Sequence, residues 1–442
     1  MHKTLITNWN NYPEIEAEVN FYSIGSEKKA SFQLGEFIPR GNGRSYGDAS
    51  LGEKVYSSLR HNKILRFNKE DGLFIAQSGI LFSEILKVIT PNGWFLPVTP
   101  GTKFITLGGA IAANVHGKNH HIDGSISRYI QFLDLLLANG EIIRCDRNQN
   151  SSIFFATIGG LGLSGIIVSA GIQLKKIEST HISQLQLKAQ NLSEILDLFD
   201  QYSYYTYSVA WIDCLKKGKQ FGRSILMLGE HSKENEVQNK KEVLIPHDNK
   251  AINVPFTFPE FVLNDFTIKW FNKLYYNKNI KSRKELQSHY DPFFYPLDSI
   301  LNWNRIYGKR GFIQYQFVLP KEAGKKYLEK ILKRITDKGW GSFLAVLKMF
   351  GPEDEGYLSF PMEGYTLALD FPIRNGLFQF LDELDKLVKE AGGRIYLTKD
   401  ARMSSQMLKD TYPNLKEFQD VIREINPEKK FQSLLSKRLE LI

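Results

Sequence analysis

The stretch GGAIAANVHGKNHH, residues 108–121, brings small residues and histidines together in one short segment. Its glycines and alanines allow another group to approach the backbone closely, whereas His116, His120 and His121 are potential metal ligands. The spacing contains no H-E-x-x-H motif, no cysteine lies nearby, and the charge of Lys118 would repel a cation. The segment therefore predicts a backbone that packs against a ligand and holds no metal.

Two further glycine-rich segments flank this stretch, PRGNGRSYGD at residues 39–48 and ATIGGLGLSGII at residues 156–167. The first lacks the G-x-G-x-x-G spacing of a dinucleotide fingerprint and the G-K-[ST] ending of a P-loop, so alone it predicts only a tight loop. Glycines in such loops can turn backbone N–H groups toward a phosphate. Three such segments in one β-rich region favour an extended ligand that contains a pyrophosphate.

Composition sets the class of protein. The chain has 442 residues, of which 42% are hydrophobic, and this predicts a globular protein of two domains. A formal charge of +9 favours anionic partners such as nucleic acid, a phosphate-bearing ligand or an acidic membrane, although a generally basic surface explains it equally. The two cysteines, Cys145 and Cys214, do not form a C-x-x-C motif, which argues against a disulfide framework, structural zinc or an iron–sulfur cluster.

The N-terminal segment contains no apolar leader, and no run of about 18 apolar residues occurs. We therefore expect a protein of the reducing cytoplasm that does not span a membrane.

The texture of the sequence changes twice along the chain. Residues 1–176 alternate short β-rich runs with glycine-rich turns, residues 177–393 contain longer amphipathic helices, and residues 394–442 return to a strand followed by helices. We expect one domain from residues 1–176 and 394–442, and a second from residues 177–393.

The second region contains an internal repeat. QYQFVLP, a helical pattern and SFLAVLKMFG are followed by TLALDFP, a second helical pattern and RIYLTKD. Each unit reads as strand, proline, helix, glycine and strand, and two such units predict one antiparallel sheet with helices behind it.

Alignment of the repeats on Pro320 and Pro372 pairs Lys348 with Lys399. Because side chains alternate along a strand, one open face of the sheet is expected to carry Gln314, Gln316, Thr366, Lys348 and Lys399. These lysines are either solvated at a strand edge or part of a pocket floor.

Six segments carry a resemblance to a known family: PRGNGRSYGD, PGTKFITLGGAIAANVHGKNHH, ATIGGLGLSGII, NWNRIYGKRGFIQYQF, LKMFG and GGRIYLTKDAR. Together they resemble the decaprenylphosphoryl-β-D-ribose 2′-oxidase family, within the vanillyl-alcohol-oxidase (PCMH) type of FAD-binding proteins. The resemblance covers essentially the whole chain, and HGKNHH and YLTKDAR are its specific motifs. It implies an α+β fold with a two-lobed FAD-binding domain and an antiparallel-sheet substrate domain that has helices on one face.

The resemblance also implies an enzyme, a flavoprotein that oxidises a secondary alcohol of a polyprenyl-phosphoryl sugar by hydride transfer to flavin N5. This is the first half of an epimerisation that a separate NAD(P)H-dependent ketoreductase would complete. A lipid-linked substrate implies peripheral contact with the inner face of the membrane, and no nucleic acid. The alternatives are a soluble sugar-alcohol or aldonolactone oxidase of the same superfamily and a non-catalytic nucleotide-binding protein.

The resemblance carries roles onto individual residues. Lys399 and His116 are the candidate catalytic residues, and the base that takes the hydroxyl proton is left open. The substrate ligands implied are Lys118, Tyr295, Gln314, Gln316 and Lys348. The residues expected to bind FAD are Arg40, Gly41, Asn42, Gly43, Arg44, Ser45, Tyr46, Pro100, Gly101, Thr106, Gly108, Gly109, Ala112, Asn114, His116, Gly117, Gly162, Gly165, Ile166 and Lys399.

At two positions the sequence differs from that of relatives. Arg44 occupies the place where covalent relatives carry a flavin-linked histidine, so non-covalent FAD is expected. Ala368 stands where some relatives have a cysteine, which leaves hydride transfer unaffected but leaves the shape of the substrate pocket open.

The segment PEFVLNDFTIKWFNKLYYNKNIKSRK places apolar residues at mostly helical spacing, namely Phe261, Val262, Phe266, Trp270 and Leu274. A basic flank follows, formed by Lys278, Lys281, Arg283 and Lys284. This pattern suits the interface of an anionic bilayer, and a core-packed helix followed by a solvated loop explains it equally.

Overall fold

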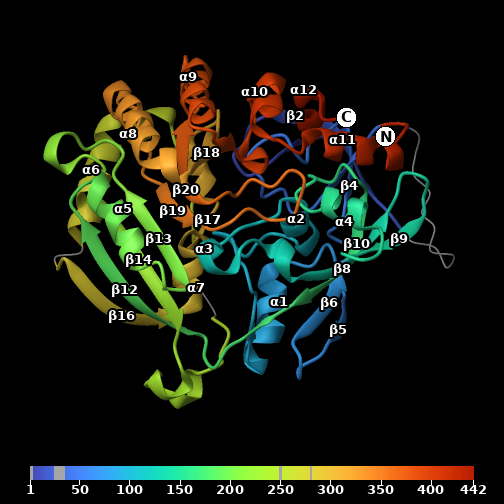
Figure 1. The fold of residues 1–442 in the computed structure, drawn as a ribbon, viewed down its shortest axis with the longest axis horizontal. Coiled ribbons are helices and arrows are strands. Elements are labelled where there is room, and N and C mark those ends of the chain that lie inside the picture. The colour runs from blue at the N-terminus through green and yellow to red at the C-terminus, as the bar shows by residue number, and fades with distance from the viewer. Residues whose placement is uncertain (1–2, 24–34, 248–250, 279–280) are drawn as a thin grey trace.

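The computed structural model describes residues 3–23, 35–247, 251–278 and 281–442. The fold is α+β, as the sequence predicts, with helices packed against several sheets (Figure 1). Within the described ranges, no helix combines the length and the apolar character needed to cross a bilayer.

The N-terminal part contains two main sheets. A mixed four-stranded sheet has the order β1 (Lys3–Thr7), β2 (Glu14–Phe21), β4 (Lys54–Ser57) and β3 (Ile38–Arg40). An antiparallel five-stranded sheet has the order β5 (Ile64–Phe67), β6 (Leu73–Gln77), β10 (Ile166–Gln173), β8 (Ile130–Leu136) and β9 (Ile142–Cys145).

Short helices complete this part of the molecule. They are α1 (Phe82–Ile89), α2 (Leu107–Ala112), α3 (His120–Asp123) and α4 (Ser151–Thr157). In α1 the apolar residues follow the i, i+3, i+4, i+7 pattern and bury Phe82, Ile85, Leu86 and Ile89 in the core.

The eight-stranded sheet is antiparallel throughout and lies to the left in Figure 1. Its order is β16 (Arg283–His289), β12 (His181–Ala189), β14 (Ser224–His231), β13 (Tyr207–Ile212), β19 (Ala345–Phe350), β20 (Gly364–Pro372), β18 (Phe312–Pro320) and β21 (Arg394–Ile395). One face is covered by the helices α5 (Leu192–Gln201), α8 (Lys321–Lys338) and α9 (Leu377–Glu390).

The expected repeat is present as β18–α8–β19 followed by β20–α9–β21. Gly339 ends α8 with a φ of 77°, a left-handed conformation that glycine adopts without strain. The second repeat is shorter than predicted, because β21 contains only Arg394 and Ile395 of RIYLTKD and the last backbone hydrogen bond to β18 comes from Tyr396. The carbonyl of Thr398 instead accepts a hydrogen bond from the backbone of Tyr46, so Lys399 lies on a short 3₁₀ turn rather than on a strand.

One helix departs from the one-sided arrangement expected for this sheet. Trp211 of β13 contacts Tyr275 of α6 (Asp265–Lys278), with ring centroids 4.8 Å apart. Its neighbours Ala210 and Ile212 point to the other face and join the core under α5 and α8. Helix α6 therefore lies against the face opposite to the other three helices.

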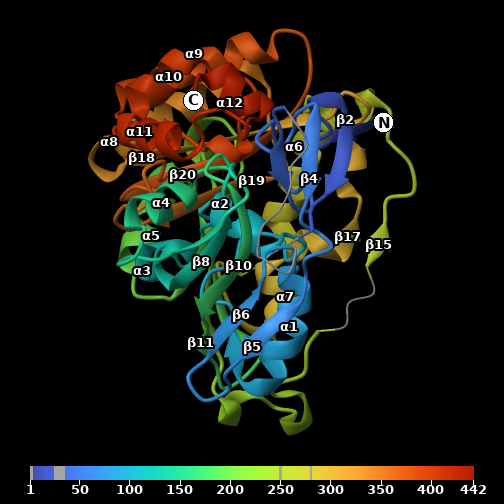
Figure 2. The same ribbon diagram turned by 90° about the vertical axis from the view of Figure 1, so that its right-hand side faces the viewer.

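The C-terminal helices return to the N-terminal part of the molecule (Figure 2). They are α10 (Ser405–Thr411), α11 (Leu415–Ile425) and α12 (Leu434–Leu439). Phe418 of α11 packs near Ala156 of α4, and the rings of Phe37 and Phe431 meet at 5.0 Å. This return brings residues near position 400 beside the first glycine-rich segment.

Candidate active site

A cavity of about 350 Å³ lies between the glycine-rich segments and the eight-stranded sheet. Residues 39–50, 100–116 and 161–167 contribute to one side, and strands β18, β19 and β20 contribute to the other. The three glycine-rich segments thus meet at one place, as the sequence suggests.

Most residues expected to bind the cofactor line this cavity. They are Arg40, Gly41, Asn42, Gly43, Arg44, Ser45, Tyr46, Pro100, Gly101, Thr106, Gly108, Gly109, Ala112, His116, Gly162, Gly165, Ile166 and Lys399. Asn114 and Gly117 lie behind the wall: Asn114 accepts a hydrogen bond from the backbone of Ser127, and a side chain on Gly117 would collide with Thr99 and Asn119.

The backbone of the cavity wall fits a large polar ligand. A Cβ atom added to Gly101 would meet no protein atom within 4 Å, so the backbone there faces open space. Inside the wall, the buried Nδ1 of His116 has no hydrogen-bond partner among the described residues. Both residues line the cavity, and small residues together with an unpartnered polar atom fit a bound cofactor.

The strand side of the cavity carries most of the polar residues that alternation predicts, together with the apolar Ala368; Thr366, expected on the same face, is not part of the cavity wall. Gln314 and Gln316 of β18, Lys348 of β19 and Ala368 of β20 all line it. Gln316 donates a hydrogen bond of 3.1 Å to Nε2 of His116, which ties the sheet to the opening stretch of the sequence. The same nitrogen of Gln316 also donates a hydrogen bond of 3.3 Å to the hydroxyl of Thr366, which helps to hold the amide in place.

The three histidines of the opening stretch have separate partners. His116 meets Gln316, whereas His120 lies 3.1 Å from Asp354 and His121 lies 2.8 Å from the carbonyl of Tyr205. They do not converge on one point, which agrees with the interpretation that the stretch serves as a wall.

Buried cations dominate the electrostatics of the cavity. Burial lowers the pKa of Lys348 to about 8, and burial together with the charge of Lys348 holds the pKa of His116 well below its ordinary value. Burial also lowers the pKa of Lys399, while the nearby carboxylate of Asp370 acts in the opposite direction. His116 is therefore neutral near pH 7, whereas Lys348 stays mostly protonated and the Asp370 carboxylate favours the charged form of Lys399.

Two predicted substrate ligands lie outside this cavity wall. Lys118 donates to the carbonyls of Phe293 and Phe294 at 2.9 and 3.2 Å, and burial lowers its pKa to about 7. Tyr295 is fully buried, with its hydroxyl 2.5 Å from that of Thr99. Both side chains connect the segment around α7 (Tyr290–Phe294) to the N-terminal part of the molecule. Neither residue lines the cavity, so their proposed binding role has no support from its geometry.

Comparison with known proteins gives the context for this geometry. A family model described as "FAD binding domain" matches residues 29–146. A decaprenylphosphoryl-β-D-ribose oxidase from Mycolicibacterium smegmatis is 36% identical over 412 residues, which cover 92% of this chain and 89% of that protein. The chain belongs to the decaprenylphosphoryl-β-D-ribose oxidase family.

Other relatives are more distant. An uncharacterized protein from Streptomyces coelicolor is 29% identical over 374 residues, which span 82% of this chain and all of that protein. The L-gulonolactone oxidase of Bos taurus is 26% identical over only 37% of this chain. As a member of the decaprenylphosphoryl-β-D-ribose oxidase family, the protein is an FAD-dependent oxidoreductase of the PCMH superfamily, which confirms the resemblance found in the sequence.

Lys399, from the motif YLTKDAR of this oxidase family, is held by the first glycine-rich segment. Its Nζ atom lies 3.6 Å from the centre of the Tyr46 ring, a cation–π distance. The adjoining backbones touch so closely that a Cβ atom on Gly47 would lie 1.8 Å from the carbonyl oxygen of Asp400. The first glycine-rich segment and the lysine turn are therefore packed directly against each other.

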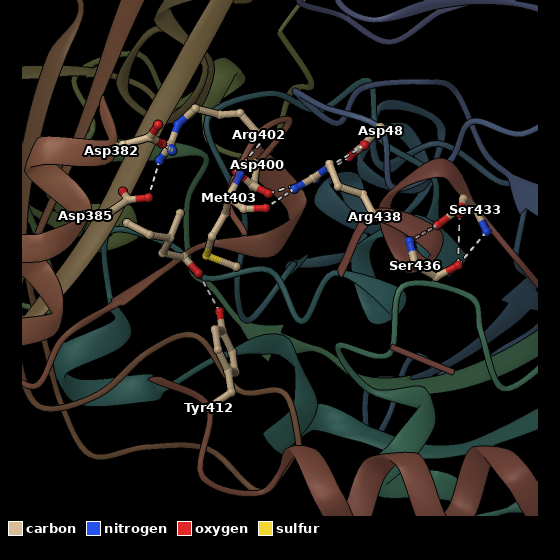
Figure 3. A network of polar contacts seen from close by, with 11 residues as sticks. Asp48, Asp382, Asp385, Asp400, Arg402, Met403, Tyr412, Ser433, Ser436 and Arg438 are labelled. Carbon is tan, nitrogen blue, oxygen red and sulfur yellow. Dashed lines mark hydrogen bonds and ion pairs between the residues drawn. The ribbon is translucent and has the colours of Figure 1, made fainter. Parts of the chain in front are cut away.

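A network of ion pairs and hydrogen bonds joins the first glycine-rich segment to the lysine turn (Figure 3). Arg438 of α12 binds Asp48 at 2.9 Å and Asp400 at 2.8 Å, and it also donates to the carbonyl of Met403 at 2.6 Å. Burial opposes ionisation of Asp400, but Arg438 and Arg402 outweigh it and lower the pKa of Asp400. Arg402 extends the network to Asp385 of α9 at 2.5 Å.

Two residues of this region were missed in the sequence. Asp370 lines the cavity, and the alternation that places Ala368 there also points to the residue two positions later. No local sequence pattern indicates the role of Arg438, because its partners are distant along the chain: Asp48 lies 390 positions away, and the second partner is Asp400.

Replacement of Arg438 by Gln is expected to destabilise the protein by about 3–5 kcal/mol, because two buried carboxylates then face each other without the cation that joins them. Urea unfolding measures this loss. Burial and mutual repulsion raise the pKa of both carboxyls in the folded variant, so the deficit should shrink as the pH falls from about 8 to 5.

The matched control is Arg423→Gln, which removes an exposed pair with Asp420 on α11. A surface pair contributes about 0–1 kcal/mol, so this variant should unfold almost as the wild type does. Equal stability of the two variants at all pH values would contradict the role given to Arg438.

Proposed function

We propose that the protein oxidises a secondary alcohol on the sugar of a polyprenyl-phosphoryl sugar, with FAD held without a covalent bond. The observation that carries this proposal is the single cavity that joins the glycine-rich segments to the polar face of the eight-stranded sheet. Similarity over 92% of the chain to a protein named for such a substrate supports the choice of sugar. The resulting ketone is a substrate for a separate NAD(P)H-dependent ketoreductase.

The proposed roles follow the two sides of the cavity. The glycine-rich segments hold the pyrophosphate and ribityl parts of FAD, through the residues that line the cavity and with Asn114 and Gly117 in support. FAD, when bound, supplies the acceptor for a hydride at N5. Lys399 places a positive charge where negative charge develops, and the neutral His116 positions the substrate hydroxyl.

The sheet side is proposed to hold the substrate. Gln314 and Gln316 donate hydrogen bonds to the sugar, and Lys348 binds the phosphate, since a buried ammonium group gains most from an anionic partner. Lys118 and Tyr295 are retained only as supports of this region. We also propose that residues 1–176 and 394–442 form the cofactor domain and residues 177–393 the substrate domain. The sheet compositions support this division except at β21, whose residues Arg394 and Ile395 belong to the eight-stranded sheet.

A test of the substrate uses the oxidised protein under anaerobic conditions. Mixing with farnesyl-phosphoryl-β-D-ribose is expected to bleach the flavin absorbance, because oxidation of the alcohol transfers two electrons. The matching 2′-deoxyribose lipid lacks the alcohol and should leave the spectrum unchanged. Bleaching by L-gulono-1,4-lactone in place of the lipid sugar would favour the alternative, an aldonolactone oxidase.

Non-covalent attachment rests on Arg44. Its guanidinium lies 4.0 Å from the centre of the Trp9 ring, and burial lowers its pKa while the charge of Asp298 opposes that effect. Arginine offers no nucleophile for a flavin linkage, so this position binds the cofactor through charge and stacking alone.

Acid or heat precipitation is therefore expected to release all of the yellow colour into the supernatant. The absorption spectrum of the supernatant and the pellet measures this. Flavin that stays with the precipitated chain would overturn the assignment.

The substrate also requires access to a bilayer, and the side chains around α6 suit such contact. Phe261, Phe266 and Trp270 are 75%, 77% and 60% exposed, values unusual for large apolar residues. Leu274 on the same helix is 49% exposed, while Val262 is half-buried. These exposures support the interfacial interpretation of the segment over a core-packed helix, and we propose peripheral binding at the cytoplasmic face of an anionic membrane.

The protein is expected to co-sediment with anionic vesicles at low salt. Replacing Lys278, Lys281, Arg283 and Lys284 by Gln should release it with FAD retained, because each basic residue adds about 1 kcal/mol near such a surface. The control replaces four exposed lysines of α8 by Gln, namely Lys325, Lys326, Lys330 and Lys333. Equal sedimentation of the two variants would exclude these four residues, of which Lys278 ends α6 and Arg283 and Lys284 begin β16, as the membrane contact.

A further inference from the structure

We propose that Asp370 is the catalytic base that accepts the proton of the substrate hydroxyl. This inference rests on the proposed oxidation of a secondary alcohol and adds the group whose identity the sequence leaves open. It is carried by the position of the carboxyl in the cavity wall and by the hydrogen bonds that orient it. The other candidate bases, His116 and Asp298, are already occupied by other partners.

The position of Asp370 follows from the register of two strands. Asp370 of β20 pairs with Gln314 of β18, and Ala368 pairs with Gln316, so these four residues form one patch of the cavity wall. The Asp370 residue is only 1% exposed, yet it lines the same cavity as Lys399. A substrate that contacts both glutamines therefore lies beside this carboxyl.

Two donors fix the orientation of the carboxyl group. The side-chain nitrogen of Gln314 donates to Oδ1 at 2.7 Å, and the hydroxyl of Tyr307 donates to Oδ2 at 3.2 Å. Tyr307 is itself held by stacking on Phe312, with ring centroids 4.1 Å apart. Each carboxylate oxygen has a further lone pair, so one can accept the proton of a substrate hydroxyl without breaking either contact.

The surrounding charges make this carboxyl a suitable proton acceptor. The titratable groups that face it are Lys399 from the 3₁₀ turn, Tyr46 from the first glycine-rich segment and Tyr307. Burial raises the pKa of Asp370, while the hydrogen bond from Gln314 and the charge of Lys399 restrain the increase. A base with a raised pKa takes a proton from an alcohol more readily than an ordinary aspartate does.

The other candidates in the cavity wall are engaged differently. Nε2 of His116 accepts from Gln316, which leaves the hydrogen on Nδ1, so this ring acts as a donor in this arrangement. Asp298 accepts from the backbone of Lys103 at 2.8 Å and lies within the electrostatic reach of Arg44. Asp370 is the carboxyl of this wall that accepts from Gln314 and faces Lys399.

The proposed step balances in atoms and electrons. The O–H bond of the substrate breaks and its proton passes to a carboxylate oxygen of Asp370. The C–H bond at the same carbon breaks with both electrons, and the hydride passes to the bound FAD. The carbon–oxygen single bond becomes the carbonyl of the ketone, and the positive charge of Lys399 compensates the negative charge gained at the acceptor.

The test compares Asp370→Asn with the wild-type holoprotein in anaerobic stopped-flow flavin reduction. Asparagine keeps the shape and can still accept from Gln314, so FAD and substrate affinity should be retained. Loss of a general base should slow reduction about 10²–10⁴-fold. The wild-type rate should rise with pH as Asp370 ionises, and this rise should disappear in the variant.

Further variants separate a base from a merely positioning residue. Asp370→Glu keeps a carboxylate and should recover part of the rate together with its pH dependence. Lys399→Ala should also lose most of the rate, but its rise with pH should persist and move to higher pH, because the carboxyl stays in place without the charge that lowers its pKa. The control Asp213→Asn removes a buried carboxylate paired with Arg223 outside the cavity wall and should reduce at the wild-type rate.

The reductant is whichever alcohol bleaches the wild-type flavin fastest, farnesyl-phosphoryl ribose or L-gulono-1,4-lactone. Reduction by the lactone alone would refute the proposed substrate while still testing Asp370. Infrared difference spectra over pH add a readout independent of turnover, a carboxyl band that is absent from Asp370→Asn. The proposal is overturned by a variant that reduces at the wild-type rate with an unchanged pH profile, or by the absence of that band.

Discussion

The ion pairs of Arg438 are the constraint on which the site depends. One guanidinium group joins Asp48, at the end of the first glycine-rich segment, to Asp400, which directly follows Lys399. Without this cation, two buried carboxylates would repel each other at the point where the two segments must touch. The N-terminal segment, the lysine turn and the C-terminal helix α12 are therefore one electrostatic unit, although they lie at opposite ends of the chain.

The same unit explains why Lys399 lies on a turn. The backbone N–H of Tyr46 donates to the carbonyl of Thr398. This carbonyl therefore does not pair with β18. The lysine consequently leaves the plane of the sheet and reaches the Tyr46 ring. If the strand continued through residue 399, the lysine would stay in the plane of the sheet and would not contact the ring of Tyr46.

Local patterns in the sequence predicted the parts of the site that strands determine. Gln314, Gln316 and Lys348 reach the cavity because alternation along a strand is a local property, and the same rule places Asp370 there. The end of β21 could not be predicted, since it depends on a hydrogen bond from a residue about 350 positions away. The contacts of Lys118 could not be predicted either: its ammonium group donates to two backbone carbonyls of α7, which lie about 175 positions away.

The charges in the cavity differ in how they are balanced, and this difference separates two tasks. Lys399 has the carboxylate of Asp370 as a partner, so burial of the pair costs less than burial of either charge alone. Lys348 has no carboxylate partner in the part of the chain that the structure describes, and burial lowers its pKa to about 8. A phosphate bound beside Lys348 would supply the missing negative charge and raise its pKa again. The balanced pair thus suits proton and hydride chemistry, whereas the unbalanced lysine suits recognition of an anion, which is the division that a phosphorylated sugar substrate requires.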